Sequence, residues 1–206
     1  MPCMIPETPP CYGPGMRAES VLFNAIKETL PEDFFVYHGV NYVLQAEARE
    51  GETDFLVLHR ERGMLAIECK GSGVRRNGAG EWIRVCSGGK EELLKKSPFV
   101  QAQLNIRDLV KELNQRISNM FPALKGEFPF YYGYSVAFPL ASAEEINLPL
   151  EVVPAILIDE TDLPDLYGKI TKAMEFWRTG KGDIKIFDPR EFRQFRKNIL
   201  HPRLHI

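Results

Sequence analysis

The 206-residue sequence lacks features that define several large classes of protein. Its four cysteines, Cys3, Cys11, Cys69 and Cys86, are too few and too scattered for a disulfide framework. No cysteine is spaced with a histidine or another cysteine as a structural zinc site requires, so the four histidines are expected to be ordinary side chains. No apolar run approaches the ~20 residues that cross a bilayer, so no membrane partner is expected.

An excess of one charge is also missing, as are two well-known catalytic motifs. Lys and Arg number 26 against 28 Asp and Glu, a net charge of −2, so nucleic acid is not held by overall charge alone. The phosphate-binding pattern of ATP-driven motors and the Gly-x-Ser-x-Gly pattern of serine hydrolases do not occur. The first residues do not resemble a secretory signal, which together with the few cysteines predicts a cytoplasmic location.

The apolar periodicity that is present predicts an α/β fold with a central mixed β-sheet flanked by helices. Residues 1–16 contain five prolines and are expected to form an irregular lead-in. We expect an α/β core over 17–160, and a C-terminal helical extension over 161–206 that packs on the core or leads to a further domain. Helices are predicted over 18–30, 98–117, 163–177 and 189–200, and strands over 34–40, 42–44, 54–59, 64–70, 81–86, 130–138 and 152–158.

Two of these strands form the most informative segment of the chain. The runs 54–59 and 64–70 are separated by four residues that end in Gly63, which supplies the positive φ that a tight reversal needs. They therefore predict a β-hairpin. Its nearly continuous apolar character predicts central strands that are covered on both faces.

Three ionisable residues lie at the open end of this hairpin. Residues two apart in a strand point the same way, so Glu68 and Lys70 share one face, and a reversal near residues 61–62 places Asp54 opposite them. Two carboxylates at this separation repel each other unless a cation neutralises them. The same pattern is also typical of an exposed cross-strand salt bridge.

If a cation is present, its chemistry follows from the donors. Mg²⁺ prefers oxygen ligands, takes one or two protein carboxylates and keeps several waters. Asp54, Glu68 and the backbone carbonyl of Cys69 are the candidate metal ligands. Lys70 beside the ion is a candidate to orient an attacking water or to stabilise charge on phosphate oxygens during phosphodiester hydrolysis.

The hairpin and its neighbours resemble a known family. Segments 52–58 and 63–71, then Trp82, then 97–102 are similar to the nuclease-related domain (NERD), a branch of the PD-(D/E)xK nuclease superfamily. The resemblance covers about residues 17–118. It implies a restriction-endonuclease-like core and a metal-dependent phosphodiesterase that uses Mg²⁺, with Mn²⁺ as a substitute.

The resemblance also implies roles for individual residues. Asp54 and Glu68 bind Mg²⁺ and Lys70 is the catalytic lysine. Glu19 matches the acid of the first helix, which helps to hold the metal or its water. Gln101 matches a glutamine that faces the site from the helix after the sheet.

The sequence departs from the wider superfamily at two positions. Thr53 stands where a proline precedes the first acid, which does not affect metal binding. Asn105 stands four residues after Gln101, where exonuclease relatives have a tyrosine. The second difference means that an exonuclease polarity cannot be carried over.

Five basic residues just beyond the acidic hairpin are candidates for nucleic-acid contacts, although such a run is equally typical of a solvated face. These are Arg75, Arg76, Arg84, Lys95 and Lys96. The ending 200–203 resembles the junction at which members of the family pass into a helicase, which implies a helicase domain in the same longer chain.

Together these patterns predict a Mg²⁺-dependent nuclease domain that hydrolyses DNA in processing or repair. The alternative is a module that keeps the fold and binds nucleic acid or a partner with negligible turnover. The sequence leaves open DNA or RNA, single or double strands, internal or terminal cutting, and the oligomeric state.

Overall fold

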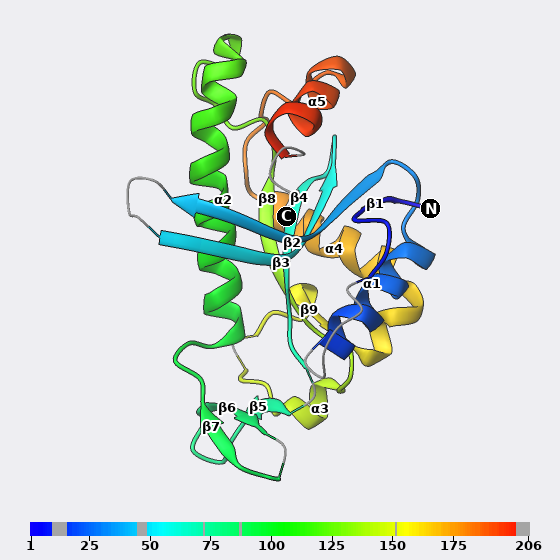
Figure 1. The fold of residues 1–206 in the computed structure, drawn as a ribbon, viewed down its shortest axis with the longest axis vertical. Helices are drawn as coiled ribbons and strands as arrows, with labels where there is room; N and C mark the ends of the chain where they lie inside the picture. The colour runs from blue at the N-terminus through cyan, green and yellow to red at the C-terminus, as the bar shows by residue number, and fades with distance from the viewer. Residues whose placement is uncertain (10–15, 45–48, 72, 87, 151, 201–206) are drawn as a thin grey trace.

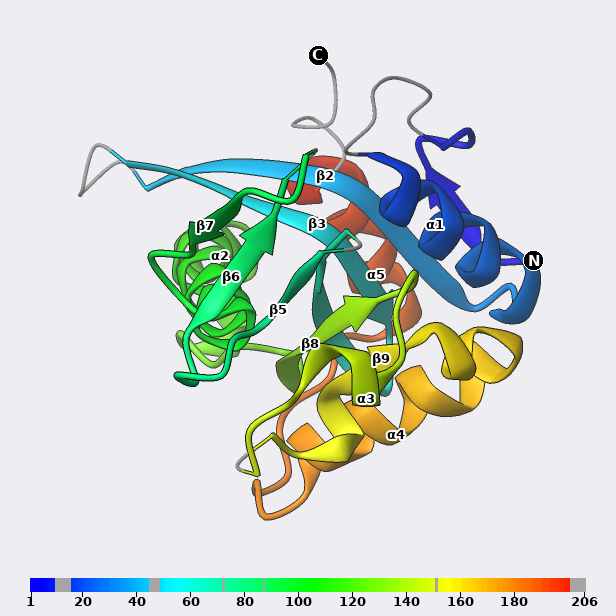
Figure 2. The same ribbon diagram turned by 90° about the horizontal axis from the view of Figure 1, so that it is seen from below.

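A computed structural model describes residues 1–9, 16–44, 49–71, 73–86, 88–150 and 152–200. Its centre is a six-stranded mixed sheet in the order β1-β2-β3-β4-β8-β9, with helices on both faces (Figures 1 and 2). β2, β3 and β4 are antiparallel, whereas β1, β8 and β9 run parallel to their neighbours. The strands are β1 Cys3–Ile5, β2 Phe34–Leu44, β3 Arg49–His59, β4 Gly63–Cys69, β8 Tyr132–Phe138 and β9 Leu157–Asp159. The predicted α/β class is confirmed.

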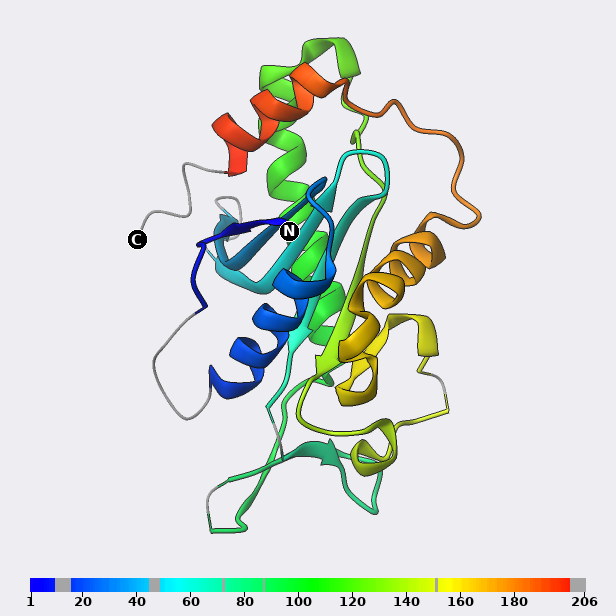
Figure 3. The same cartoon turned by 90° about the vertical axis from the view of Figure 1, so that its right-hand side faces the viewer.

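Two layers of helices cover the sheet. Helices α1 (Arg17–Thr29) and α4 (Leu166–Arg178) lie next to each other on one face (Figure 3). Helix α2 (Pro98–Met120) covers the other face, together with α5 (Pro189–Phe195) and the π-helix η6 (Arg196–Leu200). The remaining short helices are η3 Pro122–Leu124, α3 Ala143–Ile146, η4 Pro154–Ile156 and η5 Glu160–Asp165.

The alternation of side chains along β3 explains this two-sided packing. Phe55 and Val57 belong to the core under α1 and α4, whereas Leu56 and Leu58 belong to the core under α2. All seven residues of β4 are buried. The prediction of central strands covered on both faces is therefore confirmed.

The predicted hairpin turn is observed between β3 and β4. Its register pairs His59 with Gly63, so the reversal is centred on Glu61. Gly63 has a φ of 103°, and a Cβ at this position would lie 2.1 Å from the carbonyl oxygen of Tyr131. The His59 ring accepts hydrogen bonds from two backbone N–H groups of the turn, so it is a structural histidine, as expected.

The β2–β3 pair continues beyond β4 as an arm that crosses α2 (Figure 1). Tyr42 on this arm donates a hydrogen bond from its hydroxyl to the backbone carbonyl of Asn105 on α2, at 2.9 Å. Gly51 leaves room for the Tyr42 ring, since a Cβ there would lie 2.4 Å from it. The start of α2 is fixed as predicted, because Ser97 Oγ accepts the Val100 N–H at 3.1 Å.

A separate three-stranded antiparallel sheet follows β4 in the chain. It consists of β5 (Val74–Arg76), β6 (Trp82–Val85) and β7 (Glu91–Leu93), and we call it the wing. Figure 1 shows the wing projecting from the body beside α3. Only β6 had been predicted, because β5 and β7 are three polar or mixed residues each.

Three predictions about elements need correction. Cys3–Ile5 is not irregular but pairs with β2 as an edge strand, a position that tolerates the nearby prolines. The predicted strand 152–158 starts only at Leu157, because Pro154 suits the first turn of a helix and opens η4. The predicted helix 163–177 is divided into η5 and α4.

No helix within the described ranges combines the length and the apolar character that crossing a bilayer requires.

Candidate active site

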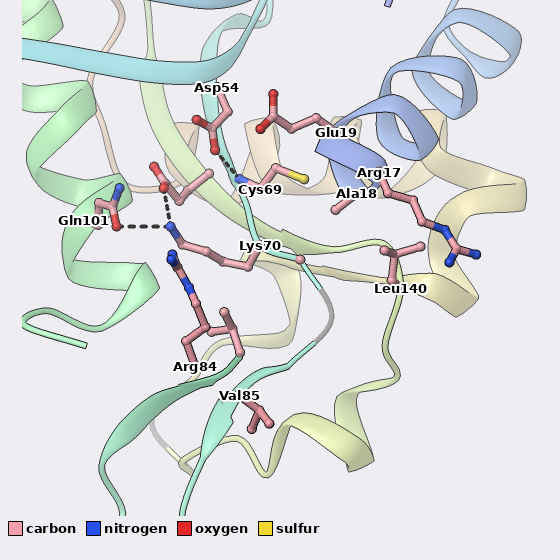
Figure 4. Close-up of a pocket in the computed structure, with 13 residues that line it drawn as sticks. Arg17, Ala18, Glu19, Asp54, Cys69, Lys70, Arg84, Val85, Gln101 and Leu140 are labelled. Atoms are coloured by element: carbon pink, nitrogen blue, oxygen red, sulfur yellow. Dashed lines mark hydrogen bonds and ion pairs between the residues drawn. The ribbon is translucent and has the colours of Figure 1, made fainter. Parts of the chain in front are cut away.

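A pocket of about 560 Å³ lies where β3 and β4 separate. The pairing of these strands ends at Phe55 with Ile67, so Asp54 and Glu68 are the first residues beyond it. Helix α1, helix α2 and the wing form the other walls (Figure 4). The lining residues are Arg17, Ala18, Glu19, Asp54, Glu68, Cys69, Lys70, Gly71, Val74, Arg84, Val85, Gln101 and Leu140.

Asp54 is a partly buried carboxylate on the floor of this pocket. Its Oδ2 accepts the backbone N–H of Cys69 at 2.7 Å, which ties the ends of the two strands together. Burial and the nearby Glu68 charge raise the pKa of Asp54 to about 7, although the Cys69 N–H opposes this shift. In the absence of a cation, Asp54 therefore holds its proton to a higher pH than an ordinary aspartate does.

Glu68 and Lys70 form the second half of the site. Lys70 Nζ donates to Glu68 Oε1 at 2.6 Å, and the two side chains are only 13% and 4% exposed, respectively. This low exposure excludes the solvated surface salt bridge that the sequence pattern also allowed. Burial raises the pKa of Glu68, and the Lys70 ammonium offsets part of the effect.

Helix α2 supplies two amides to this ion pair. Gln101 Oε1 accepts from Lys70 Nζ at 3.2 Å, and Asn105 Nδ2 donates to Glu68 Oε2 at 3.1 Å. Residues four apart lie on one face of a helix, so a single turn of α2 offers an acceptor to the lysine and a donor to the glutamate. The position of Asn105 in the site was not predicted. The only signal in the sequence was its spacing from Gln101.

Glu19 reaches the pocket from the first turn of α1. Its Oε2 lies 2.7 Å from Nε2 of His38, a β2 residue whose ring packs against Phe55 and Phe23. The predicted acid of the first helix thus lies on the same side of the pocket as Asp54 (Figure 4). Its histidine partner could not be identified from the sequence, because the two residues are 19 positions apart on different elements.

The predicted contribution of Cys69 to a metal site concerned its backbone carbonyl, and the environment of the thiol agrees with an unreactive side chain. The Cys69 side chain belongs to the core under α1 and α4, on the face opposite Glu68. Burial raises the pKa of this thiol well above its ordinary value, so it stays protonated and apolar.

The donor set fits Mg²⁺. Glu68 is buried and Asp54 is partly buried, and both have raised pKa values that a cation would lower. No group of three Cys, His, Asp or Glu side chains suited to a metal ion occurs in the described part of the chain. An ion here would therefore use two carboxylates, a backbone carbonyl and water, which is the ligand set typical of Mg²⁺ rather than Zn²⁺.

The five basic residues predicted to contact nucleic acid do not form one cluster. Arg84 lines the pocket, and Figure 4 shows its guanidinium directed from β6 toward the Lys70 ammonium. Arg76 instead donates to the backbone carbonyl of Gly80 and holds a turn of the wing. Arg75 is half-exposed and pairs with Glu91 at 3.3 Å. Lys95 and Lys96 are exposed and do not line the pocket.

Three residues considered in the sequence, Cys11, His201 and His205, lie outside the described residues.

A comparison with models of known protein families identifies the family of this chain. The family model described as "Nuclease-related domain" matches residues 14–139, which is more than half of the chain. No curated protein and no solved structure matches the sequence.

Proposed function

The chain belongs to the nuclease-related domain family, and on this premise we propose that it hydrolyses DNA phosphodiester bonds with the help of Mg²⁺. The observation that carries the proposal is the convergence of Asp54, Glu68 and Lys70 in one recessed pocket. Buried charged groups are costly, and their concentration in a cleft is typical of functional sites. Asp54 and Glu68 would hold the ion.

When bound, Mg²⁺ polarises a phosphate oxygen and lowers the pKa of a coordinated water. Lys70 is already oriented by Glu68 and Gln101, so its ammonium is positioned for the negative charge that develops on the phosphate oxygens. The amides of α2 hold both partners of the ion pair in place before substrate binds. Glu19, held by His38, would bind a water of the ion.

We further propose that this activity serves DNA processing or repair in the cytoplasm, linked to a helicase domain in a longer chain. Membership of a nuclease-related family supports a role on nucleic acid, and the low cysteine content supports the location. We propose that residues 17–160 form the nuclease core. Residues 161–206 then form a helical extension that packs on this core and completes it.

Metal binding tests the first half of the proposal. We expect Mg²⁺ and Mn²⁺ to give a binding isotherm with the wild-type protein by calorimetry, and Asp54→Asn to abolish it. Asparagine keeps an oxygen that can accept the Cys69 N–H, so loss of binding would reflect the charge rather than the fold. Absence of binding in both proteins would instead favour a module that binds nucleic acid or a partner without catalysis.

Cleavage of linear, circular and branched DNA with Mg²⁺ or Mn²⁺ tests the second half. We expect Lys70→Ala to reduce the rate by about 10²–10³-fold, as is typical when a group that stabilises developing charge is removed. Lys172→Ala on the exposed side of α4 is the matched control and should cleave like wild type. Undiminished cleavage by Lys70→Ala would show that the assigned site is wrong.

A further inference from the structure

A second cavity of about 540 Å³ adjoins the candidate active site. It lies between the wing and helix α3. Val74, Val85 and Leu140 line both cavities, so their surfaces are continuous. The combined hollow begins at Asp54 and Glu68 and extends under β5 and β6 toward α3.

The lining of this hollow changes along its length. Near the carboxylates it is polar and includes Arg84. The floor of the second cavity is apolar, because it is formed by Ala141 and Ile146 together with the three residues that line both cavities. Arg75 lies at its rim. Proteins that bind single-stranded nucleic acid combine positive groups that follow the phosphates with side chains that contact the faces of the unpaired bases, most strongly aromatic ones. In this cavity the surface offered to the bases is aliphatic.

The charges at the rim leave room for an anionic chain. Arg75 pairs with Glu91 in an exposed geometry, at 3.3 Å, and pairs of this kind contribute little, so a phosphate can replace the glutamate. Glu145 is the acid that lines the second cavity. Its Oε2 accepts a hydrogen bond from the backbone N–H of Ser142 in the capping box of α3. This hydrogen bond holds the carboxylate against the start of the helix, where its negative charge is partly offset.

The depth of the reaction centre restricts what can reach it. Glu68 is buried and Lys70 is largely shielded from solvent, and the two residues lie between α1 on one side and the wing on the other. A cavity of this volume accommodates a small ligand or about one nucleotide. A duplex is much wider than one nucleotide, so a strand separated from its partner reaches these recessed groups more readily than a duplex does.

We propose that the substrate of this site is a single strand of DNA, which passes from the carboxylates along β5 and β6 into the second cavity. Arg84 contacts the phosphate beside the reaction centre, and Arg75 contacts a later one. The proposal rests on the proposed nuclease function and specifies its substrate class.

The test compares a short single-stranded oligonucleotide, its duplex, and the small diester bis(p-nitrophenyl) phosphate. We expect the single strand to be cleaved at least ~10-fold faster than the duplex, a difference of about 1.4 kcal/mol. Ala141→Phe fills the second cavity and should raise the KM for the single strand about 10-fold, without changing hydrolysis of the small diester. Because Ala141 is half-buried, Arg75→Gln serves as a second variant that leaves the packing intact.

Arg84→Gln should weaken single-strand binding about 10-fold, whereas Lys172→Gln, with the same change of charge on the exposed side of α4, should not. Equal or faster cleavage of the duplex, or wild-type KM values for all three wing and cavity variants, would overturn the proposal. If neither DNA nor the small diester is hydrolysed, the nuclease function fails. Fluorescence anisotropy of labelled single-stranded and duplex DNA in EDTA then still decides the strand preference.

Discussion

Asp54 carries a carboxylate whose protonation depends on its surroundings in the fold. Burial and Glu68 raise its pKa to about 7, well above the ordinary 3.8. The native metal-free protein therefore keeps a proton on Asp54 over a pH range in which the unfolded chain has released it. This difference links the stability of the protein to pH.

We expect the contribution of Asp54 to the free energy of unfolding in EDTA to fall as the pH rises from about 4 to 7. The sign follows from proton counts, because in this window the native state binds more protons than the unfolded state. The contribution of Asp54 is at most about 4 kcal/mol, at about 1.4 kcal/mol per pKa unit. Urea unfolding of wild type and Asp54→Asn at several pH values measures it.

The free energy of unfolding of the wild type should fall relative to that of the variant as the pH rises through this window. Asp183→Asn, which changes an exposed aspartate, is the control and should follow the wild-type curve. Parallel curves for wild type and Asp54→Asn would show that Asp54 titrates normally in the folded protein.

At the scale of elements, the hairpin turn between β3 and β4 determines which residues meet in the pocket. A shift of one residue in its register would turn Glu68 and Lys70 toward the opposite face. Gly63 holds the register in two ways. Its φ of 103° is strained for any other residue, and its Cα packs against the backbone of Tyr131.

We therefore expect Gly63→Ala to destabilise the protein by about 2–4 kcal/mol, from backbone strain together with overpacking. Gly78→Ala is the matched control in the wing, because nothing lies within 4 Å of the added methyl group. It should change stability by less than about 0.5 kcal/mol. The midpoints of urea unfolding compare the two, and similar midpoints would contradict this role for Gly63.

At the scale of the whole molecule, the sheet needs helices from both ends of the chain. On one face, α1 packs beside α4, which follows the sheet in sequence. On the other face, Phe187 and Phe195 extend the core that α2 forms. The segment after residue 160 is therefore part of the same packing unit as the candidate active site.

We expect the fragment 1–160 not to fold cooperatively. The side chains that it lacks include five large buried ones, each of which contributes about 2 kcal/mol by burial, and the sum is comparable to the total stability of a typical domain. These are Leu166, Ile170, Met174, Phe187 and Phe195. Thermal unfolding, followed by near-ultraviolet circular dichroism, compares the fragment 1–160 with the full chain. A sharp transition in the fragment would show that 161–206 is dispensable.

The sequence by itself determined the local elements and the chemistry of the site. The spacing of apolar residues predicts α1, the hairpin and α2, because it depends only on residues that are close in sequence. Ser97 and Pro98 mark the start of α2. The spacing of Glu68 and Lys70 was sufficient to place both on one face. The strands β1, β5 and β7 have only three residues each, which is too short for a recognisable alternation of apolar residues. They are strands because they pair with neighbouring strands.

Only the tertiary structure decided which distant residues complete the site. Gln101 was expected at the site from the family resemblance. Its contact with Lys70 and the position of Asn105 beside Glu68, across 31 and 37 residues of sequence, arise because α2 crosses the sheet at that point. Arg84 enters the pocket, whereas Lys95, just after the last strand of the same wing, does not. These positions, and the raised pKa of Asp54, depend on burial and on the crossing of elements, which no local pattern of residues encodes.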